Sequence, residues 1–351
     1  MGKAKILVCM AWLACWLTGR AGEAVEMRVG HFPNVTHAQA VLGRATGEFE
    51  KTAGLPIRWS QFNAGPSAVE ALFAGALDAS YIGPNPAVNG FLKSKGKSFC
   101  IVAGAASGGA ALVLRPDAGI QGEKDFGGKK VATPQLGNTQ DVAARVWFQS
   151  KGYRLVEKGG DLTLMPLANP DQLLMFQKRQ IDAAWTIEPW VSRLEQEAGG
   201  RIFLEEKSLW KNGRYVTTLL VVSRSFLSSN RSAVKRLIKA HVAMTRRLAA
   251  RQEALLPVLN GELRKETGKE LSPAVLRSAM KRVEFTWEPM RESLLKSAED
   301  AYKAGFLREE PVLDGIYDLS LLEEVLKEKD QAFFSGGTAV QEPRPPLEHN
   351  K

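Results

Sequence analysis

Apolar residues from position 27 onward follow two periods in succession. Met27 to Gly30 reads as a short strand, and from Ala38 to Phe49 the apolar residues recur three and four positions apart, the spacing of one helix face. Thr36 and Gln39 fit a capping box at the start of that helix. The pattern predicts a strand–helix unit whose connecting loop, residues 31–37, lies beyond the carboxyl end of the strand.

The same alternation continues through the next two hundred residues. Further strands are predicted at residues 55–62, 76–82, 99–104, 110–115, 129–132, 162–167 and 217–222, with amphipathic segments between most of them. Strands that alternate with helices of this length indicate parallel sheets with helices on both faces. The predicted fold class is therefore α/β.

Two segments about a hundred residues apart share one pattern. Residues 76–81 and 180–185 both show the order apolar, Asp, Ala, small, aromatic, and both run into a helix start that contains proline. Two halves with matching units predict two domains that face each other.

The loop that begins at Thr133 is the strongest candidate for a binding element. It follows an apolar strand, and a helix begins at about Gln140. Free N–H groups at a helix start carry partial positive charge, so with the side chains of Asn138, Thr139 and Gln140 they could form a cradle for a small anion. The alternative is an ordinary capped turn with no ligand.

Length and composition narrow the class of protein. A chain of 351 residues is long enough for two domains, and 44% hydrophobic with 24% charged residues is ordinary for a soluble globular protein. The net charge of +9 is spread without a run of five like charges or a basic stripe with aromatics. Nucleic-acid binding is therefore not expected.

The amino-terminal residues have the layout of a secretory signal. Lys3 and Lys5 precede an apolar run from Ile6 to Leu17, and small residues follow. We expect residues 1–24 to be a signal peptide cleaved after Ala21 or Ala24, which gives a periplasmic protein. The alternative is a lipid anchor on Cys15. At the other end, residues 335–351 are rich in Gly and Pro, and we expect a disordered tail.

The sequence offers little support for catalysis or metal binding. Cys100 lies in an apolar run and is the one cysteine outside the leader, so no disulfide framework is expected. His31 and His37 are the only close pair of histidines, and no serine has a Gly-x-Ser-x-Gly setting. We expect no metal, no cofactor and no enzymatic activity.

Several segments together resemble one family. They are residues 30–37, 77–79 with Gly83 and Pro86, 107–110, 133–141, 182–183 with Trp185, Glu188 and Pro189, and 317–322. Over about residues 27–330 the sequence resembles the substrate-binding proteins of nitrate/sulfonate/bicarbonate-type ABC importers, especially the aliphatic sulfonate and taurine binding proteins. The resemblance implies a type II periplasmic-binding-protein fold, in which two doubly wound α/β domains enclose a ligand cleft. It implies domain 1 from residues 27–114 plus 219–330 and domain 2 from residues 115–218, with hinges near Arg115 and Thr217.

Residues at the expected carboxyl ends of strands are the candidates for contact with a ligand. They are Asn34, Thr36, His37, Asn85, Ser107, Gly108, Gly109, Asn138, Thr139, Gln140, Trp185 and Glu188. Several have a structural alternative: Thr36 and Asn85 could only cap helices, and Trp185 could be core. Glu188 and Asp141 could cap helices or face the cleft, where a carboxylate would repel nitrate or sulfate and favour a zwitterion.

The expected function is capture of a small sulfonate-like oxyanion, an aliphatic sulfonate or taurine, for delivery to an ABC permease in the inner membrane. The alternatives are nitrate or bicarbonate, or an uncharged precursor of the thiamine-pyrimidine type. We expect a monomer that binds a small anion or zwitterion and no nucleic acid.

Overall fold

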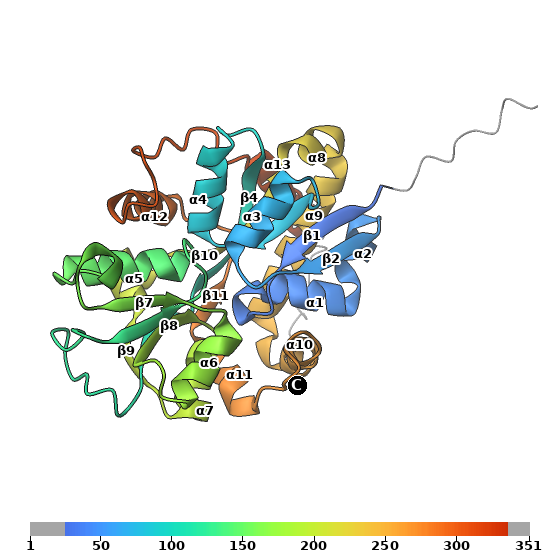
Figure 1. The fold of residues 1–351 in the computed structure, drawn as a ribbon. Coiled ribbons are helices and arrows are strands. Elements are labelled where there is room, and N and C mark those ends of the chain that lie inside the picture. Colours follow the sequence, from blue (N-terminus) through green and yellow to red (C-terminus); the bar gives the residue numbers. More distant parts are fainter. Residues whose placement is uncertain (1–24, 336–351) are drawn as a thin grey trace, which may run out of the picture.

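The computed structural model describes residues 25–335, with the surroundings of side chains described as far as residue 328. The chain forms two lobes, each built on one sheet with helices packed against it (Figure 1). The expected signal peptide, the Cys15 anchor and residues 336–351 of the expected tail lie outside the described residues. No helix within residues 25–335 has the length and apolar character needed to cross a membrane.

The first lobe contains a six-stranded sheet with the order β11-β4-β10-β3-β1-β2. β1 is parallel to β2 and β3, whereas β10 is antiparallel to both β3 and β4. The strands are β1 (Met27–His31), β2 (Ile57–Gln61), β3 (Ala79–Ile82), β4 (Phe99–Gly108), β10 (Val216–Ser223) and β11 (Val283–Phe285).

Helices cover both faces of this sheet. Val29, Val41 and Leu237 belong to the core on one face, and Leu72, Ile82 and Val88 belong to the core on the other. The helices are η1 (Val35–His37, a 3-10 turn), α1 (Ala38–Thr46), α2 (Glu48–Ala53), α3 (Gly65–Phe73), α4 (Pro84–Lys93), α8 (Arg224–Ser229), α9 (Arg231–Ala250), α10 (Gln252–Thr267), α11 (Pro273–Lys281), α12 (Arg291–Lys303) and α13 (Ser320–Ser335).

The second lobe is smaller and contains a five-stranded sheet with the order β7-β6-β8-β5-β9. Its core on one face is aromatic, with Phe126, Trp147, Phe148 and Trp185 packed edge to face. Its elements are β5 (Ala110–Leu114), β6 (Lys130–Thr133), α5 (Thr139–Ser150), η2 (Val156–Lys158), β7 (Thr163–Pro166), α6 (Asn169–Gln177), β8 (Ala183–Ile187), α7 (Trp190–Ala198), β9 (Arg201–Glu205), η3 (Glu206–Leu209) and η4 (Lys211–Gly213).

The repeated sequence pattern has the same structural role in both lobes. Asp78 accepts a hydrogen bond from the backbone N–H of Arg28 at 2.8 Å, and Asp182 accepts one from the N–H of Lys130 at 2.9 Å. Each carboxylate also pairs with an arginine, Arg28 in the first lobe and Arg115 in the second. Each Asp thus fixes the register between two parallel strands of its own sheet. The predicted α/β class and the two-domain fold are confirmed.

Sheet membership places the first crossing earlier than expected and the second close to the expected hinge near Thr217. β5 belongs to the second sheet, so the chain leaves the first lobe at Gly108 and Gly109 instead of near Arg115, and β10 joins the first sheet at Val216. Gly108 and Gly109 have φ angles of +79° and +84°, which only glycine adopts easily. The apolar run 110–114 identifies a buried strand, but it carries no signal of which sheet the strand joins.

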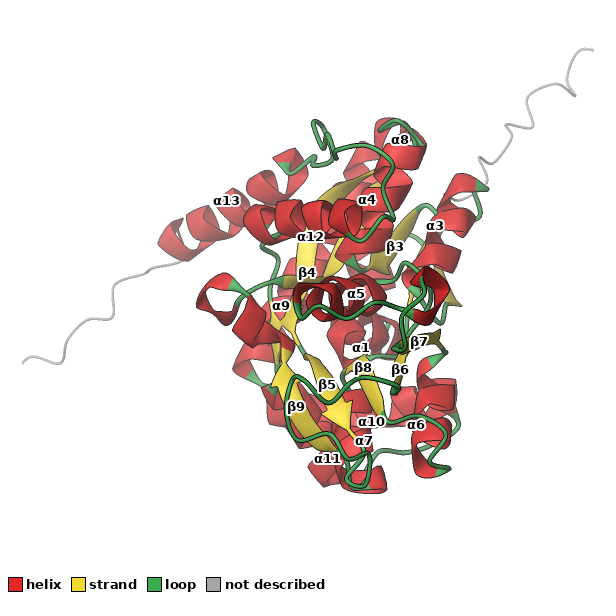
Figure 2. Cartoon of the chain, turned by 60° about the vertical axis from the view of Figure 1, so that its left-hand side comes forward, coloured by secondary structure: helices red, strands yellow, loops and turns green. Residues whose placement is uncertain are grey.

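The two lobes contact each other along several helices. α12 of the first lobe packs against α5 of the second, and α11 packs against α7. Figure 2 shows α12 lying alongside α5 at the junction of the two lobes. The structure is therefore a closed form, in which the carboxyl ends of β1, β3, β6 and β8 lie in the interface.

Candidate ligand-binding cleft

Four helix starts converge where the lobes meet. η1 follows β1 and α4 follows β3 in the first lobe, while α5 follows β6 and α7 follows β8 in the second. Ligands of parallel sheets bind beyond the carboxyl ends of the strands, where helix starts direct N–H groups at them. The structure therefore brings the loops that the sequence predicts for the cleft to the junction of the two lobes.

Thr139, the first residue of α5, lies against Gly83, the residue before α4. A Cβ atom on Gly83 would lie 2.5 Å from Thr139 Oγ1 and 3.7 Å from the carbonyl oxygen of Thr217. Leu219 of β10 pairs with Ile82 of β3, so the next pair in the same register brings Thr218 beside Gly83. Gly83 thus marks a point where both lobes and the first residues of β10 come together.

The hydroxyl groups at this point are buried and unpaired. Thr139 Oγ1, Thr217 Oγ1 and Thr218 Oγ1 have no hydrogen-bond partner within the described part of the chain. Thr139 is 5% exposed, Thr217 5% and Thr218 0%. Each buried, unsatisfied hydroxyl costs about 1–3 kcal/mol, so each of the three is a candidate hydrogen-bond donor to a polar ligand.

The predicted loop before α5 is held by Asp141 and Asn138. Asp141 accepts hydrogen bonds from Thr133 Oγ1 at 2.7 Å and from the N–H of Gly137 at 3.0 Å, and it pairs with Arg145 at 3.1 Å. Asn138 Oδ1 accepts the N–H of Thr139 at 2.7 Å, as an N-cap residue does. Both side chains hold the loop itself. Gln140, the second residue of α5, is buried, with 4% of its surface exposed.

His37 presents a neutral imidazole at the start of α1. Its Nδ1 accepts the backbone N–H of Phe32 at 3.3 Å, so the ring proton resides on Nε2, which can donate. Burial lowers the pKa of His37 well below its ordinary value, and the nearby His31 adds to this effect. The ring lies between Phe32 and Tyr81 and supplies an uncharged donor.

Two other candidates at the first helix start face the second lobe. Asn34 Oδ1 accepts the indole N–H of Trp190 at 3.1 Å, a hydrogen bond between the lobes. A Cβ atom on Gly109 would lie 3.4 Å from Thr36 Cγ2 and 3.7 Å from Glu188 Cβ. Asn34, Thr36, Gly109 and Glu188 therefore meet beside the first crossing.

Glu188 is buried, and its charge is balanced by Arg282 from the first lobe. Its carboxylate accepts hydrogen bonds from the N–H and hydroxyl of Ser192 and pairs with Arg282 at 3.1 Å. Burial raises the pKa of Glu188 to about 7, although Ser192 and Arg282 oppose the rise. Because these partners occupy the carboxylate, Glu188 is not available to hold a ligand amine.

Arg282 itself joins the lobes through three carboxylates of the second lobe. It pairs with Glu188, with Glu195 at 2.8 Å and with Glu205 at 3.1 Å. Burial would lower the pKa of Arg282, but the charges of these carboxylates outweigh it and raise the pKa. The sequence does not reveal this residue, because nothing distinguishes one arginine among 47 lysines and arginines.

Three of the sequence candidates have structural partners elsewhere. Trp185 lies in the aromatic core of the second lobe, and its N–H donates to Glu206 at 2.7 Å. Asn85 donates to the carbonyl oxygen of Ser297 on α12 at 2.9 Å. Ser107, the residue before Gly108, accepts the N–H of Tyr215 at 3.2 Å. This hydrogen bond joins the first crossing to the segment that leads back into the first lobe at β10. We leave these side chains out of the proposed ligand site.

Two of the cavities in the described part of the chain open between the lobes and are large enough for a small organic ligand. One has a volume of about 590 Å³ at the mouth of the cleft, and we call it the vestibule. Its lining residues are Gln61, Phe62, Asn63, Ala64 and Ser67 from the first lobe and Pro134, Gln135, Leu136, Pro166 and Ala168 from the second.

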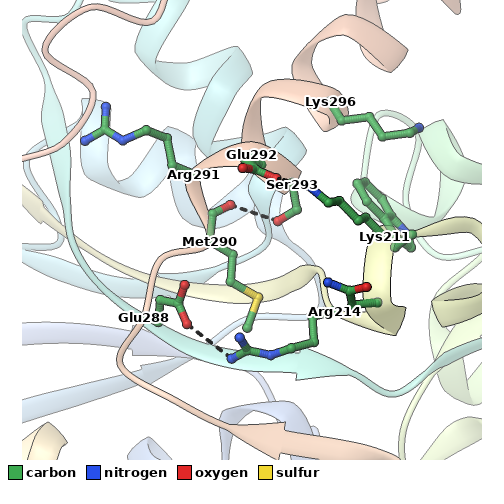
Figure 3. Close-up of a pocket in the computed structure, with 10 residues that line it drawn as sticks. Lys211, Arg214, Glu288, Met290, Arg291, Glu292, Ser293 and Lys296 are labelled. Carbon is green, nitrogen blue, oxygen red and sulfur yellow. Dashed lines mark hydrogen bonds and ion pairs between the residues drawn. The ribbon is translucent and has the colours of Figure 1, made fainter.

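The other cavity, of about 660 Å³, lies between residues 210–214 and the start of α12 (Figure 3). Charged side chains line most of it: Arg214 pairs with Glu288 at 3.2 Å, and Lys211 lies 3.7 Å from Glu292. These groups are open to solvent and satisfy one another. The cavity is far less suited to holding a desolvated ligand than the cleft around Thr139.

The side chains that could support metal or nucleophilic chemistry are dispersed. Within residues 25–335, no group of three or more His, Cys, Asp and Glu side chains is placed to hold a metal ion. Cys100 is buried, and burial raises its pKa to about 11, which disfavours the thiolate.

Comparison with known proteins agrees with the fold. The model of the NMT1-like family matches residues 20–256. The chain belongs to the NMT1-like family. Its resemblance to the binding proteins of sulfonate- and nitrate-type importers is confirmed by the relatives and structures described next.

One similar sequence is the taurine-binding periplasmic protein of Escherichia coli, 23% identical over 223 residues. The match covers 63% of this chain and spans 65% of the length of that relative. Among solved structures, the alkanesulfonate-binding protein SsuA from Xanthomonas axonopodis, bound to MOPS, has a TM-score of 0.69 at 20% identity, covering 85% of this chain and 99% of SsuA. The nitrate-binding protein NrtA from Synechocystis has a TM-score of 0.75 at 13% identity, covering 87% and 89%. At these identities the structures establish the shared fold.

Proposed function

We propose that this member of the NMT1-like family is an extracytoplasmic substrate-binding protein of an ABC importer, whose two lobes close over a small sulfonate-like oxyanion. The observation that carries the proposal is the buried, unpaired hydroxyl group of Thr139, which lies against Gly83 at the junction of the lobes. Thr217 and Thr218, whose backbone runs beside Gly83, also have buried, unpaired hydroxyl groups. An oxyanion bound between the lobes would accept a hydrogen bond from Thr139 and would favour the closed form.

The chemistry of the donors supports an anion that is bound reversibly. The candidate donors are hydroxyls, the Nε2–H of His37 and the first N–H groups of α5, all of them neutral. Several moderate hydrogen bonds in a desolvated cleft hold an anion without a buried cation, which would be costly to uncover each time the cleft opens. A sulfonate suits such a site because it stays ionised and offers three acceptor oxygens.

Among the sulfonates, the surroundings of Glu188 affect how well taurine would fit the cleft. Taurine carries an ammonium group, which would need an acceptor in the cleft. The Glu188 carboxylate already has Ser192 and Arg282 as partners. A simple alkanesulfonate therefore fits the described donors better than taurine, and the same pairing removes the repulsion that Glu188 would exert on an anion.

Transport itself is the second part of the proposal. Substrate-binding proteins deliver their ligand when the closed lobes dock on a membrane permease and reopen. We propose that the protein is exported to the periplasm, acts as a monomer and serves an inner-membrane permease without a catalytic role of its own. The relatives named above are binding proteins, which supports this assignment.

The test is a calorimetric titration of the purified mature protein. The ligands are butane-1-sulfonate, taurine, nitrate, bicarbonate, sulfate and a hydroxymethylpyrimidine. We expect saturable binding of the sulfonate at one site per chain. If only nitrate or only the pyrimidine bound, that compound would represent the ligand class in place of the sulfonates. If none of the six compounds gave a heat of binding, the proposal would be overturned.

A further inference from the structure

A groove between α9 and the end of β11 has aromatic walls. It has a volume of about 370 Å³ and is lined by α9 residues between 245 and 250 and by Phe285, Thr286 and Trp287. The guanidinium carbon of Arg246 lies 5.4 Å from the centre of a Trp287 ring, and within residues 25–328 no carboxylate pairs with this arginine. We call this site the aromatic groove. It combines apolar surface with one cation.

The aromatic groove lies along an edge of the first sheet. β11 is the last strand in the order of that sheet, and its strand partner there is β4. Thr286 and Trp287 continue beside β4, because the N–H of Thr286 donates to the carbonyl oxygen of Ala105 and the carbonyl oxygen of Trp287 accepts the N–H of Gly104. Phe285 and Trp287 are only partly buried. Folded proteins usually cover such an edge with another segment, so this edge favours an occupant.

α13 leads the chain toward the aromatic groove. Lys235 of α9 pairs with Glu324 of α13 at 2.7 Å, and Lys239 lies 4.0 Å from Glu328. Residue numbers therefore rise together along both helices, which run in the same direction. Ser335, the last residue of α13, is seven positions beyond Glu328, and the groove begins six to seven positions beyond Lys239. The segment that follows α13 thus starts close to the groove.

That segment has the composition of a ligand for an aromatic groove. Residues 342–348 read Glu-Pro-Arg-Pro-Pro-Leu-Glu. Proline-rich segments favour the polyproline II conformation before they bind, so they lose little entropy in an aromatic-lined groove. Three residues make one turn of this conformation, so Glu342, Pro345 and Glu348 would share one face. The six residues 336–341 can span roughly 20 Å when extended, which is enough to reach the groove.

We propose that residues 342–348 of this chain dock in the aromatic groove, with Pro345 against the ring of Trp287 and the two glutamates of the same face beside Arg246. The docked segment covers the edge of the sheet at β11 and gives the arginine a carboxylate partner. The inference is independent of the proposed function, because it requires no ligand in the cleft.

The experiment is calorimetric titration of the full mature protein with a synthetic peptide of residues 336–351. In the wild type the chain's own segment competes for the groove at an effective concentration on the order of 1 mM, so we expect weak binding of the peptide. A full-length variant with Glu342→Ser, Pro345→Ser and Glu348→Ser loses the docking face and exposes the groove. It should bind the peptide at least about tenfold more tightly than the wild type does.

The matched control replaces three residues of the other faces, Pro343→Ser, Arg344→Ser and Leu347→Ser. It should bind the peptide within about threefold of the wild type, because its docking face is intact. Equal peptide affinity in the wild type and the first variant, including no binding by either, overturns the docking. A control that binds the peptide as tightly as the first variant overturns the assignment of the face.

Sedimentation of the wild type and the first variant identifies the chain that supplies the segment. Docking within one chain predicts monomers of both proteins at every concentration. A concentration-dependent dimer of the wild type that the first variant does not form would place the segment in the groove of a second copy, which overturns docking within one chain.

Discussion

The Thr139 hydroxyl is the residue-scale feature on which binding depends most. It is enclosed between α5 and α4, and it has no hydrogen-bond partner among the described residues. A hydroxyl that does not stabilise the free protein can contribute its full hydrogen bond to a ligand. Its effect should therefore be visible in affinity and not in stability.

Replacement of Thr139 tests this directly. We expect Thr139→Val to weaken sulfonate binding by about 1–3 kcal/mol, roughly 5- to 150-fold, because the isosteric side chain cannot donate. The melting temperature of the free protein should be unchanged or slightly higher. Gln149→Ala, at an exposed position on the same helix, is the control and should bind normally. Unchanged affinity in Thr139→Val would remove Thr139 from the site.

Glu188 gives the protein a pH-dependent stability. The pKa of its carboxyl group is about 7 in the folded protein against an ordinary value of 4.5, with burial as the main cause. The folded state holds this proton more tightly than the unfolded state, so the stabilising contribution is complete below pH 4.5 and is lost as the pH rises through about 7.

The Glu188→Gln variant should lack this dependence. Since the carboxyl shift corresponds to about 3 kcal/mol at most, the free energy of unfolding of the wild type should fall relative to the variant as the pH rises from 4.5 to 7. Urea unfolding of both proteins at several pH values measures the difference. If the unfolding free energy of the wild type minus that of the variant stayed constant or rose between pH 4.5 and 7, the raised pKa of Glu188 would be contradicted.

At the scale of elements, the crossing at Gly108 and Gly109 determines how the lobes connect. Gly109 has a φ of +84°, and a Cβ atom there would lie 2.8 Å from Val283 Cγ2 of β11. A side chain would therefore strain the backbone and also push β11 away from the crossing.

The Gly109→Ala variant separates these two effects when it is compared with Gly128→Ala. Gly128 has a φ of +70°, but a Cβ atom there would meet nothing within 4 Å. We expect both variants to lose about 1 kcal/mol of unfolding free energy to backbone strain, and Gly109→Ala to lose about 1–3 kcal/mol more to the clash. Equal losses in urea unfolding would show that the crossing tolerates a side chain.

Local patterns in the sequence predicted most of the strands and the helix that begins at Thr139. The loop from Thr133 to Thr139 was recognisable as the start of a helix, where the Asn138 side chain accepts the N–H of Thr139, and the repeated Asp78 and Asp182 signalled two similar sheets. What remained hidden depends on contacts between distant segments. Trp185 has the same neighbours in sequence whether it faces core or cleft, and Arg282 becomes special only through three carboxylates of the other lobe.

At the scale of the whole molecule, contacts across the cleft favour the closed arrangement. They include the hydrogen bond between Trp190 and Asn34, the ion pairs of Arg282, and the pair of Lys269 with Glu197 at 2.7 Å. In two-lobed proteins of this fold, ligands act by favouring closure about short hinges. The free protein should therefore exchange with an open form that butane-1-sulfonate depletes.

Small-angle X-ray scattering measures this change. We expect the radius of gyration of the wild type to decrease when butane-1-sulfonate is added, because the ligand holds the lobes together. In Arg282→Gln the free protein should be more expanded, since the variant leaves Glu188, Glu195 and Glu205 without their shared cation. A radius that is the same for both proteins, with and without ligand, would argue against ligand-driven closure.

The central claim is that an oxyanion is held where Gly83 and Thr139 bring the lobes together. Calorimetric titration of Gly83→Ala with butane-1-sulfonate, beside the wild type, tests it most directly, because the added methyl group would lie 2.5 Å from Thr139 Oγ1 in the closed form. We expect binding by the variant to fall by at least about tenfold, while its melting temperature without ligand stays close to that of the wild type. Wild-type affinity in Gly83→Ala would contradict it.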